Sequence, residues 1–129
     1  MKLTLWQMKD RVMNAQEIIS LRHKAEQGDA VSQHTLGMLL LIGQEVPQNF
    51  DEARLWFRRA ANQDYSFSYN ALAYIYEKGK GVPRNFSMAL EYYLKAENLG
   101  CPMALENYIN LRRWLQSGDY DTPAPTFIF

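Results

Sequence analysis

The sequence predicts an all-α fold, a solenoid of antiparallel helix pairs, on three observations. Residues 66–100 repeat residues 30–64 without a gap, with ten identities at the 35 aligned positions. Within each copy apolar residues recur at three- and four-residue steps, as Leu36, Leu39 and Leu40 do, which indicates helices. Between two such stretches each copy carries glycine, proline and then asparagine, which is typical of a loop followed by a helix N-cap.

Each copy is expected to contain two helices joined by that loop. The expected helices are 31–42, 50–62, 67–78 and 86–98. Asn49 and Asn85 stand where an N-cap belongs, and Glu52 follows Asn49 at the spacing of a capping box. The second helices carry large rings alternating with alanine, which lets neighbouring helices approach closely.

The ends of the chain are predicted to be partial units of one helical-repeat domain. The expected segments are an N-terminal cap at 1–29, repeats at 30–65 and 66–101, a partial third repeat at 102–117 and an extended tail at 118–129. The N-terminal segment is expected to break near Met13–Asn14, and a third first helix is expected at 103–116. The second helix of this partial repeat is missing, so we expect the tail to cover the apolar surface that the last helix leaves open. The alternatives are that the tail fills the groove, or that it docks on a partner or a second copy.

The two copies resemble units of the Sel-one-like repeat family, relatives of the tetratricopeptide repeats. The resemblance covers LGMLLLIGQEVPQNFDEARLWFRRAANQD and LAYIYEKGKGVPRNFSMALEYYLKAENLG. It departs from the family pattern at Leu40, Glu45, Asp64 and Ala73. The resemblance implies a right-handed superhelix with a concave face, and an adaptor or binding role through protein–protein contacts. Some bacterial members accompany secreted effectors or regulate signalling.

Composition narrows the class of partner. Fourteen basic and fourteen acidic residues cancel, so the chain has no general attraction for nucleic acid or anionic lipid. The apolar stretch near the N-terminus is too short for a signal peptide, and the longest apolar run, 39–42, is too short for a membrane span. With one cysteine, Cys101, no internal disulfide can form. We therefore expect a cytoplasmic protein that binds neither nucleic acid nor membrane.

The loop EKGKGVPRNF at 77–86 superficially resembles a phosphate-binding loop. It lacks the required Lys-Ser/Thr pair and a preceding strand, Pro83 removes a backbone donor, and the first copy keeps only the turn residues. We interpret it as a structural turn. Its basic residues form a possible rim for an acidic partner: Lys78, Lys80 and Arg84.

Catalytic and metal-binding patterns are not found. His23 and His34 lie eleven residues apart on different predicted helices without acidic or thiol ligands at metal spacing. Cys101 precedes a helix, which can lower a thiol pKa, but a small residue at a repeat junction is the simpler interpretation. We expect no cofactor and no enzyme activity; a small hydrolase is the remote alternative.

The exposed edge of each first helix is predicted to line the concave groove. The candidate partner-binding residues are His34, Met38, Leu41, Phe67, Asn70, Tyr74, Glu77, Glu106, Asn110 and Arg113, with Val31 and Met103 at the start of the row. Rings, thioethers and arginine are typical of protein interfaces. The sequence thus predicts an adaptor, a regulator or a bacterial immunity-type inhibitor holding one protein partner. The alternative is a homodimer or larger homo-oligomer with its tail in the groove.

Overall fold

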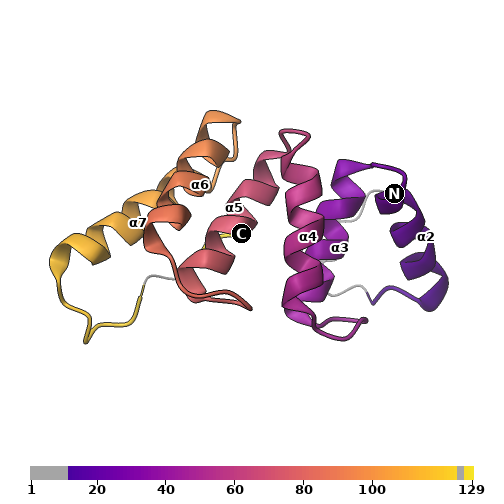
Figure 1. Cartoon of the computed structure of the whole chain (residues 1–129), viewed down its shortest axis with the longest axis horizontal. Helices are drawn as coiled ribbons and strands as arrows, with labels where there is room; N and C mark the ends of the chain where they lie inside the picture. Colours follow the sequence, from indigo (N-terminus) through magenta and orange to yellow (C-terminus); the bar gives the residue numbers. More distant parts are fainter. Residues whose placement is uncertain (1–11, 125–126) are drawn as a thin grey trace.

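The computed structural model describes residues 12–124 and 127–129, and within these ranges the chain forms six α-helices and no strand. The helices are α2 Ala15–Glu26, α3 Ala30–Ile42, α4 Phe50–Ala61, α5 Ser66–Lys78, α6 Phe86–Asn98 and α7 Ala104–Ser117. They follow one another along the long axis of the molecule in chain order (Figure 1). The predicted all-α repeat fold is confirmed. None of the helices described is both long enough and apolar enough to cross a membrane.

The helix ends follow the predicted loop chemistry. The side chains of Asn49 and Asn85 accept hydrogen bonds from the backbone N–H groups of Glu52 and Met88, both at 3.0 Å. Asn14 caps α2 in the same way, and the helical segment expected before Met13–Asn14 falls mostly on residues that the structure does not describe. The part of the N-terminal cap before residue 12 lies outside the described residues. Helix α7, the first helix of the partial third repeat, begins one residue later than expected, because Met103 is its N-cap.

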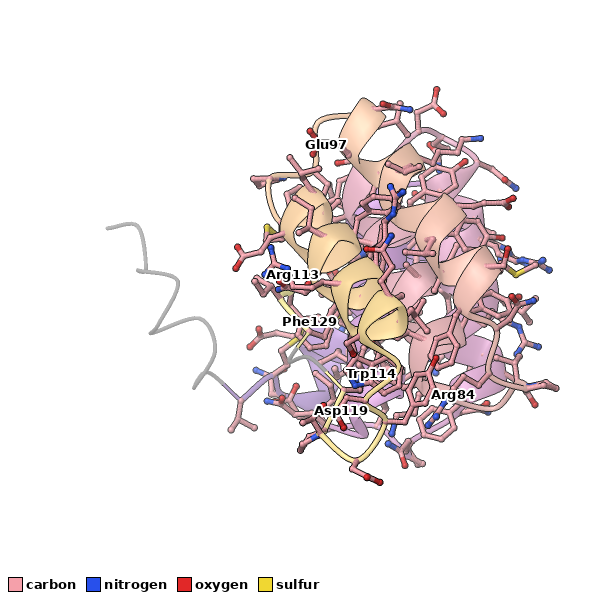
Figure 2. The ribbon with its side chains drawn as sticks, turned by 90° about the vertical axis from the view of Figure 1, so that its left-hand side faces the viewer. Arg84, Glu97, Arg113, Trp114, Asp119 and Phe129 are labelled. Carbon is pink, nitrogen blue, oxygen red and sulfur yellow. The ribbon has the colours of Figure 1, made fainter. Side chains whose placement is uncertain are left out.

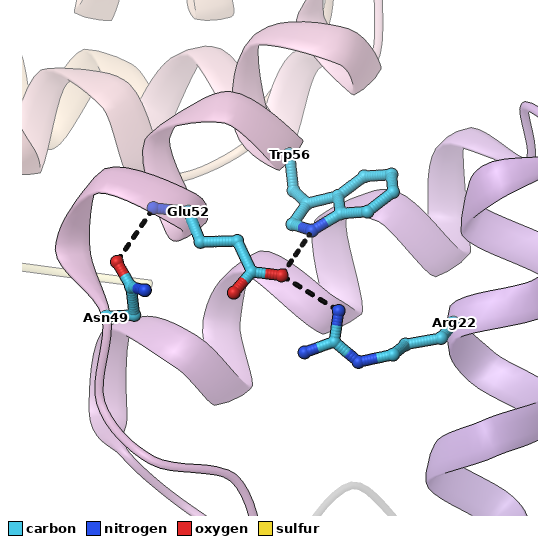
Figure 3. Close-up of polar contacts among 4 residues, drawn as sticks. All are labelled: Arg22, Asn49, Glu52 and Trp56. Atoms are coloured by element: carbon cyan, nitrogen blue, oxygen red, sulfur yellow. Dashed lines mark hydrogen bonds and ion pairs between the residues drawn. The ribbon is translucent and has the colours of Figure 1, made fainter.

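Glu52 does not complete the capping box. Its Oε1 atom accepts instead from Arg22 of α2 at 2.8 Å and from the Trp56 indole N–H at 3.3 Å (Figure 3). The Arg22 hydrogen bond is the main cause that lowers the pKa of the Glu52 carboxyl. One carboxylate thus ties the N-terminal helix to the first repeat.

In each repeat an aromatic ring of the second helix packs against a small residue of the first helix. Phe57 of α4 is fully buried, and a methyl group at Gly37 of α3 would lie 2.8 Å from its ring. In the second pair the corresponding residues are Tyr93 and Ala73, both fully buried. The alternation of rings and small residues therefore sets how closely the two helices approach.

The loop at 79–85 packs the second repeat onto the first. Gly81 has φ 73°, and a Cβ atom there would lie 2.7 Å from the Phe50 Cβ at the start of α4. Two departures from the family pattern occupy equivalent left-handed positions without glycine: Glu45 has φ 64° and Asp64 has φ 60°. Because side chains rarely adopt this conformation, both positions carry backbone strain.

Candidate functional site

The end of the tail is bound through its main chain by two asparagine side chains. Asn107 of α7 accepts from the Ile128 N–H at 2.9 Å and donates to the Ile128 carbonyl at 2.7 Å. Asn70 of α5 donates to the same carbonyl at 3.1 Å, and its own carbonyl oxygen accepts from Asn107 at 3.0 Å. The C-terminus accordingly returns to α5 rather than lying beyond α7 (Figure 1).

Aromatic rings surround this polar contact. The Phe127 ring lies 4.6 Å from the Tyr74 ring and 6.2 Å from the Tyr93 ring. Phe129 lies 5.5 Å from Tyr74 and 4.4 Å from Phe127. We call the residues that receive the tail the tail site: Asn70, Tyr74, Tyr93 and Asn107.

An earlier part of the tail lies against the end of α7. The Trp114 ring is 5.0 Å from the Tyr120 ring, and its N–H donates to the Thr122 carbonyl at 3.3 Å. This part lies against the end of α7, whereas the last three residues enter the tail site. Leu105 and Ile109 of α7 remain 44% and 40% exposed, so the tail does not replace the missing pairing helix.

A second polar contact joins the first helices α3 and α5. The Nδ1 atom of His34 lies 2.9 Å from the Ser68 hydroxyl, and three rings pack around the imidazole: Phe57, Tyr65 and Phe67. Burial lowers the pKa of His34 from 6.5 to about 4. The imidazole is therefore neutral at physiological pH and serves as an uncharged part of this surface.

Glu77 is buried between the helices of its pair. It is 4% exposed, accepts from the Tyr93 hydroxyl at 3.0 Å and lies 2.9 Å from the Lys78 ammonium. Burial, followed by the charge of Glu77, raises the pKa of Tyr93 far above its ordinary value. Leu41, the equivalent residue in the first repeat, is likewise buried, at 5% exposure.

The other predicted groove residues lie on the same three helices. Met38 is half-buried on α3, and Glu106 is exposed on α7. Asn110 and Arg113 of α7 line a hollow of about 350 Å³ together with the tail residues Asp119, Thr122 and Pro123. In Figure 2, Phe129 lies on the same side of α7 as Arg113.

The three cations of the predicted basic rim contact their own chain. Lys78 pairs with Glu77, Lys80 lies 5.8 Å from the Phe50 ring and Arg84 lies 5.6 Å from the Phe86 ring. Figure 2 places Arg84 across α7 from Phe129. Lys78 is thus linked through Glu77 to Tyr93 of the tail site, whereas Lys80 and Arg84 lie against the rings of Phe50 and Phe86.

The candidate reactive thiol is packed into the core. Cys101 is fully buried, and desolvation raises the pKa of its thiol despite two backbone hydrogen bonds that favour the thiolate. Within the described parts of the chain no group of three or more His, Cys, Asp and Glu side chains is placed to hold a metal ion. What the tail site offers chemically is recognition of a polypeptide main chain by amides.

Sequence reasoning missed Asn107, the centre of the tail site. It is 3% exposed and lies one turn from the fully buried Ala104 and Leu111, so it belongs to the buried stripe of α7 and not to the predicted positions Glu106, Asn110 and Arg113. An asparagine within an apolar stripe was the available signal, because a buried amide requires partners.

Comparison with known proteins identifies the repeat. The Sel1 repeat family model matches residues 30–65 and 66–101. A protective antigen of uropathogenic Escherichia coli with an SLR fold, c5321, shares 37% identity over 70% of this chain, with a TM-score of 0.67. A Sel1 repeat protein from Oxalobacter formigenes shares 27% identity over 76% of this chain, with a TM-score of 0.70.

Cysteine rich protein B of Helicobacter pylori has the same fold, with a TM-score of 0.66, 24% identity and coverage of 73% of this chain and 71% of that one. This chain spans 20% of the Escherichia coli protein and 41% of the Oxalobacter protein. A search of the curated proteins gave no match.

Proposed function

Because the chain belongs to the Sel1 repeat family, whose members generally act as non-catalytic scaffolds for protein–protein interactions, we propose that it holds one protein partner on its first-helix face. This face comprises the surface residues of α3, α5 and α7. The observation that carries the proposal is the tail site, where Asn70 and Asn107 already bind the main chain of a non-helical segment.

The make-up of the face supports this proposal. Rings of Phe67 and Tyr74 and the thioether of Met38 are partly exposed there, beside the charged side chains of Glu106 and Arg113. Such a mixture is typical of interface anchors surrounded by a polar rim. An adaptor, a regulator and an immunity-type inhibitor would all use it in the same way. A homo-oligomer whose tail enters the site of a second copy is the alternative role.

Site-specific photo-crosslinking in native lysate tests the face. A photoreactive residue at Met38 or Glu106 should yield a covalent adduct with one partner. The same residue at Leu55 or Leu94, which are 56% and 41% exposed on the second helices, should yield none. Adducts from the second helices alone would place the site elsewhere, and adducts of the chain with itself would favour the homo-oligomer.

Substitution then measures how much the face contributes. Changing His34, Tyr74 and Arg113 to alanine should weaken capture of the crosslinked partner while leaving the helical content unchanged. Arg58→Ala is the matched control for Arg113→Ala, because Arg58 is an exposed arginine on the second helix α4. Equal affinity of the face variants and the control would refute the proposed face.

A further inference from the structure

We propose that the tail site binds an extended segment of a partner protein with aromatic residues on both sides of one non-proline residue, and that residues 127–129 of this chain occupy it until such a segment displaces them. The inference rests on the proposed function and adds to it the class of ligand and the competition with the tail.

The two asparagines bind the tail through the main chain of one residue, Ile128. Asn107 binds both the N–H and the carbonyl of Ile128, at 2.9 and 2.7 Å, and Asn70 binds the same carbonyl at 3.1 Å. No polar group of the Ile128 side chain takes part. Any residue with a backbone N–H can therefore stand at this position, and proline cannot.

With the tail bound, the main chain of Ile128 supplies partners for groups that the two amides do not use on each other. Asn70 and Asn107 are 2% and 3% exposed. The bond between them at 3.0 Å uses one donor of Asn107 and the acceptor of Asn70. The remaining donor of Asn107, its acceptor and a donor of Asn70 all go to Ile128. Buried amides require such partners, so the pair is organised to receive a peptide unit.

The flanking positions select aromatic side chains. Phe127 and Phe129 both contact Tyr74, with ring centroids 4.6 and 5.5 Å apart. Side chains two residues apart lie on one side of an extended chain, which indicates that the bound segment is extended. Phe127 also reaches Tyr93 and belongs to the core cluster formed around that residue. Aromatic pairs of this kind contribute about 0.5–1.5 kcal/mol each.

Attachment to the chain gives the tail its advantage over a free segment of the same sequence. A tethered ligand has an effective concentration in the millimolar range, so the chain's own tail occupies the site when no competitor is present. A segment of another chain can make the same contacts and displace the tail when it binds tightly enough. Phe129 is 53% exposed, and the other two residues are partly exposed. A competing segment can thus approach the site from solvent.

The test uses the full chain with its tail released by Phe127→Ala and Ile128→Pro. The probe is a fluorescein-labelled synthetic peptide with the sequence of residues 120–129, and binding is followed by fluorescence anisotropy. We expect the tail-released chain to bind the probe at least ten-fold more tightly than the wild-type chain. Adding Asn107→Leu should weaken binding at least ten-fold. Adding Asn98→Leu, the same exchange at an exposed asparagine on α6, should not.

The peptide itself can be changed to test main-chain recognition. Methylation of the nitrogen corresponding to Ile128 should abolish binding, because it removes the N–H that Asn107 accepts. Replacing that isoleucine by valine should preserve binding, and replacing the residue corresponding to Phe127 by alanine should weaken it. Equal binding of the methylated and unmethylated peptides, or no binding to the tail-released chain, would overturn the inference.

A measurement on the otherwise wild-type chain covers the case in which a released variant fails to fold. With 4-fluorophenylalanine at position 127, Asn107→Leu should move the ¹⁹F resonance toward that of the free peptide, and Asn98→Leu should leave it in place. An unmoved resonance, or a dimer by light scattering that Asn107→Leu converts to a monomer, would overturn occupancy by the chain's own tail. If these tests fail while crosslinking to a partner from Met38 or Glu106 persists, the proposed function stands without this ligand class.

Discussion

The two repeats differ in one buried pair, and this difference gives a quantitative prediction. Tyr93 and Glu77 are hydrogen-bonded in the second repeat at 3.0 Å, and the residues 36 positions earlier are Phe57 and Leu41. All four are at most 5% exposed. We expect Tyr93→Phe and Glu77→Leu each to lower the free energy of unfolding, and the double substitution to recover most of the loss.

The magnitudes follow from the contacts that each change leaves. Tyr93→Phe removes a bond to a carboxylate, which is worth about 1.5–3 kcal/mol, and leaves Glu77 with Lys78 at 2.9 Å. Glu77→Leu leaves the buried Tyr93 hydroxyl without its acceptor, at a cost of about 1–3 kcal/mol. The double variant installs the apolar pair of the first repeat and should lie within about 1 kcal/mol of wild type. The coupling energy should therefore exceed about 1.5 kcal/mol.

Urea denaturation followed by tryptophan fluorescence measures this double-mutant cycle. Tyr108→Phe is the control, because the Tyr108 residue is partly exposed and its hydroxyl accepts from the exposed Arg112 side chain at 3.1 Å; it should change stability by less than about 0.5 kcal/mol. Losses that add, with a coupling energy below about 0.5 kcal/mol, would refute the assignment of Glu77 and Tyr93 as one buried unit.

Three further predictions concern single positions. Glu45→Gly should raise the free energy of unfolding by about 0.5–1 kcal/mol, because it removes the strain at φ 64° and a buried carboxylate oxygen without a partner; a lower thermal midpoint would contradict this. His34 has a pKa of about 4 when folded, against 6.5 as its ordinary value, so the unfolded chain binds the proton first and stability should fall as pH drops from 6.5 to 4. His34→Gln should flatten that slope in denaturation at stepped pH, and an unchanged slope would contradict the assignment. Arg22→Ala should cost at most about 1 kcal/mol, since the Arg22 and Glu52 side chains are 38% and 31% exposed, and hydrogen exchange should increase in α2 but not in α6.

The fold could be predicted because its signals are local and repeated. Asn49 and Asn85 cap helices with their own side chains, at the same place in each copy. Such contacts span three residues and leave a direct mark in the sequence. The start of α7 was displaced by one residue because Met103 takes the N-cap place without a side-chain hydrogen bond, so no capping residue marks the boundary.

The tail site could be predicted only in part because its contacts join distant, unrepeated residues. Asn70 and Tyr74 were on the predicted edge, but their contacts with Ile128 and Phe127 bridge more than fifty residues. Asn107 aligns with Ala71 in the second repeat, so comparison of the copies gives no reason to expect a shared role. Glu52 shows the same limit, because Arg22 competes for the side chain that the capping box would use.

Two polar contacts join the first helices, one between α3 and α5 and one between α5 and α7. Their chemistry explains why the main chain of the tail binds at the α5–α7 contact. At the α3–α5 contact, His34 meets Ser68 and rings close around it, so the imidazole is covered by side chains of the repeats themselves. At the α5–α7 contact, two amides meet, and each retains hydrogen-bonding groups beyond the bond that joins them. Those groups must be satisfied from outside the helices, and a peptide unit supplies a donor and an acceptor at the spacing of one residue. The position of the binding site therefore follows from a pair of asparagines rather than from the curvature of the array.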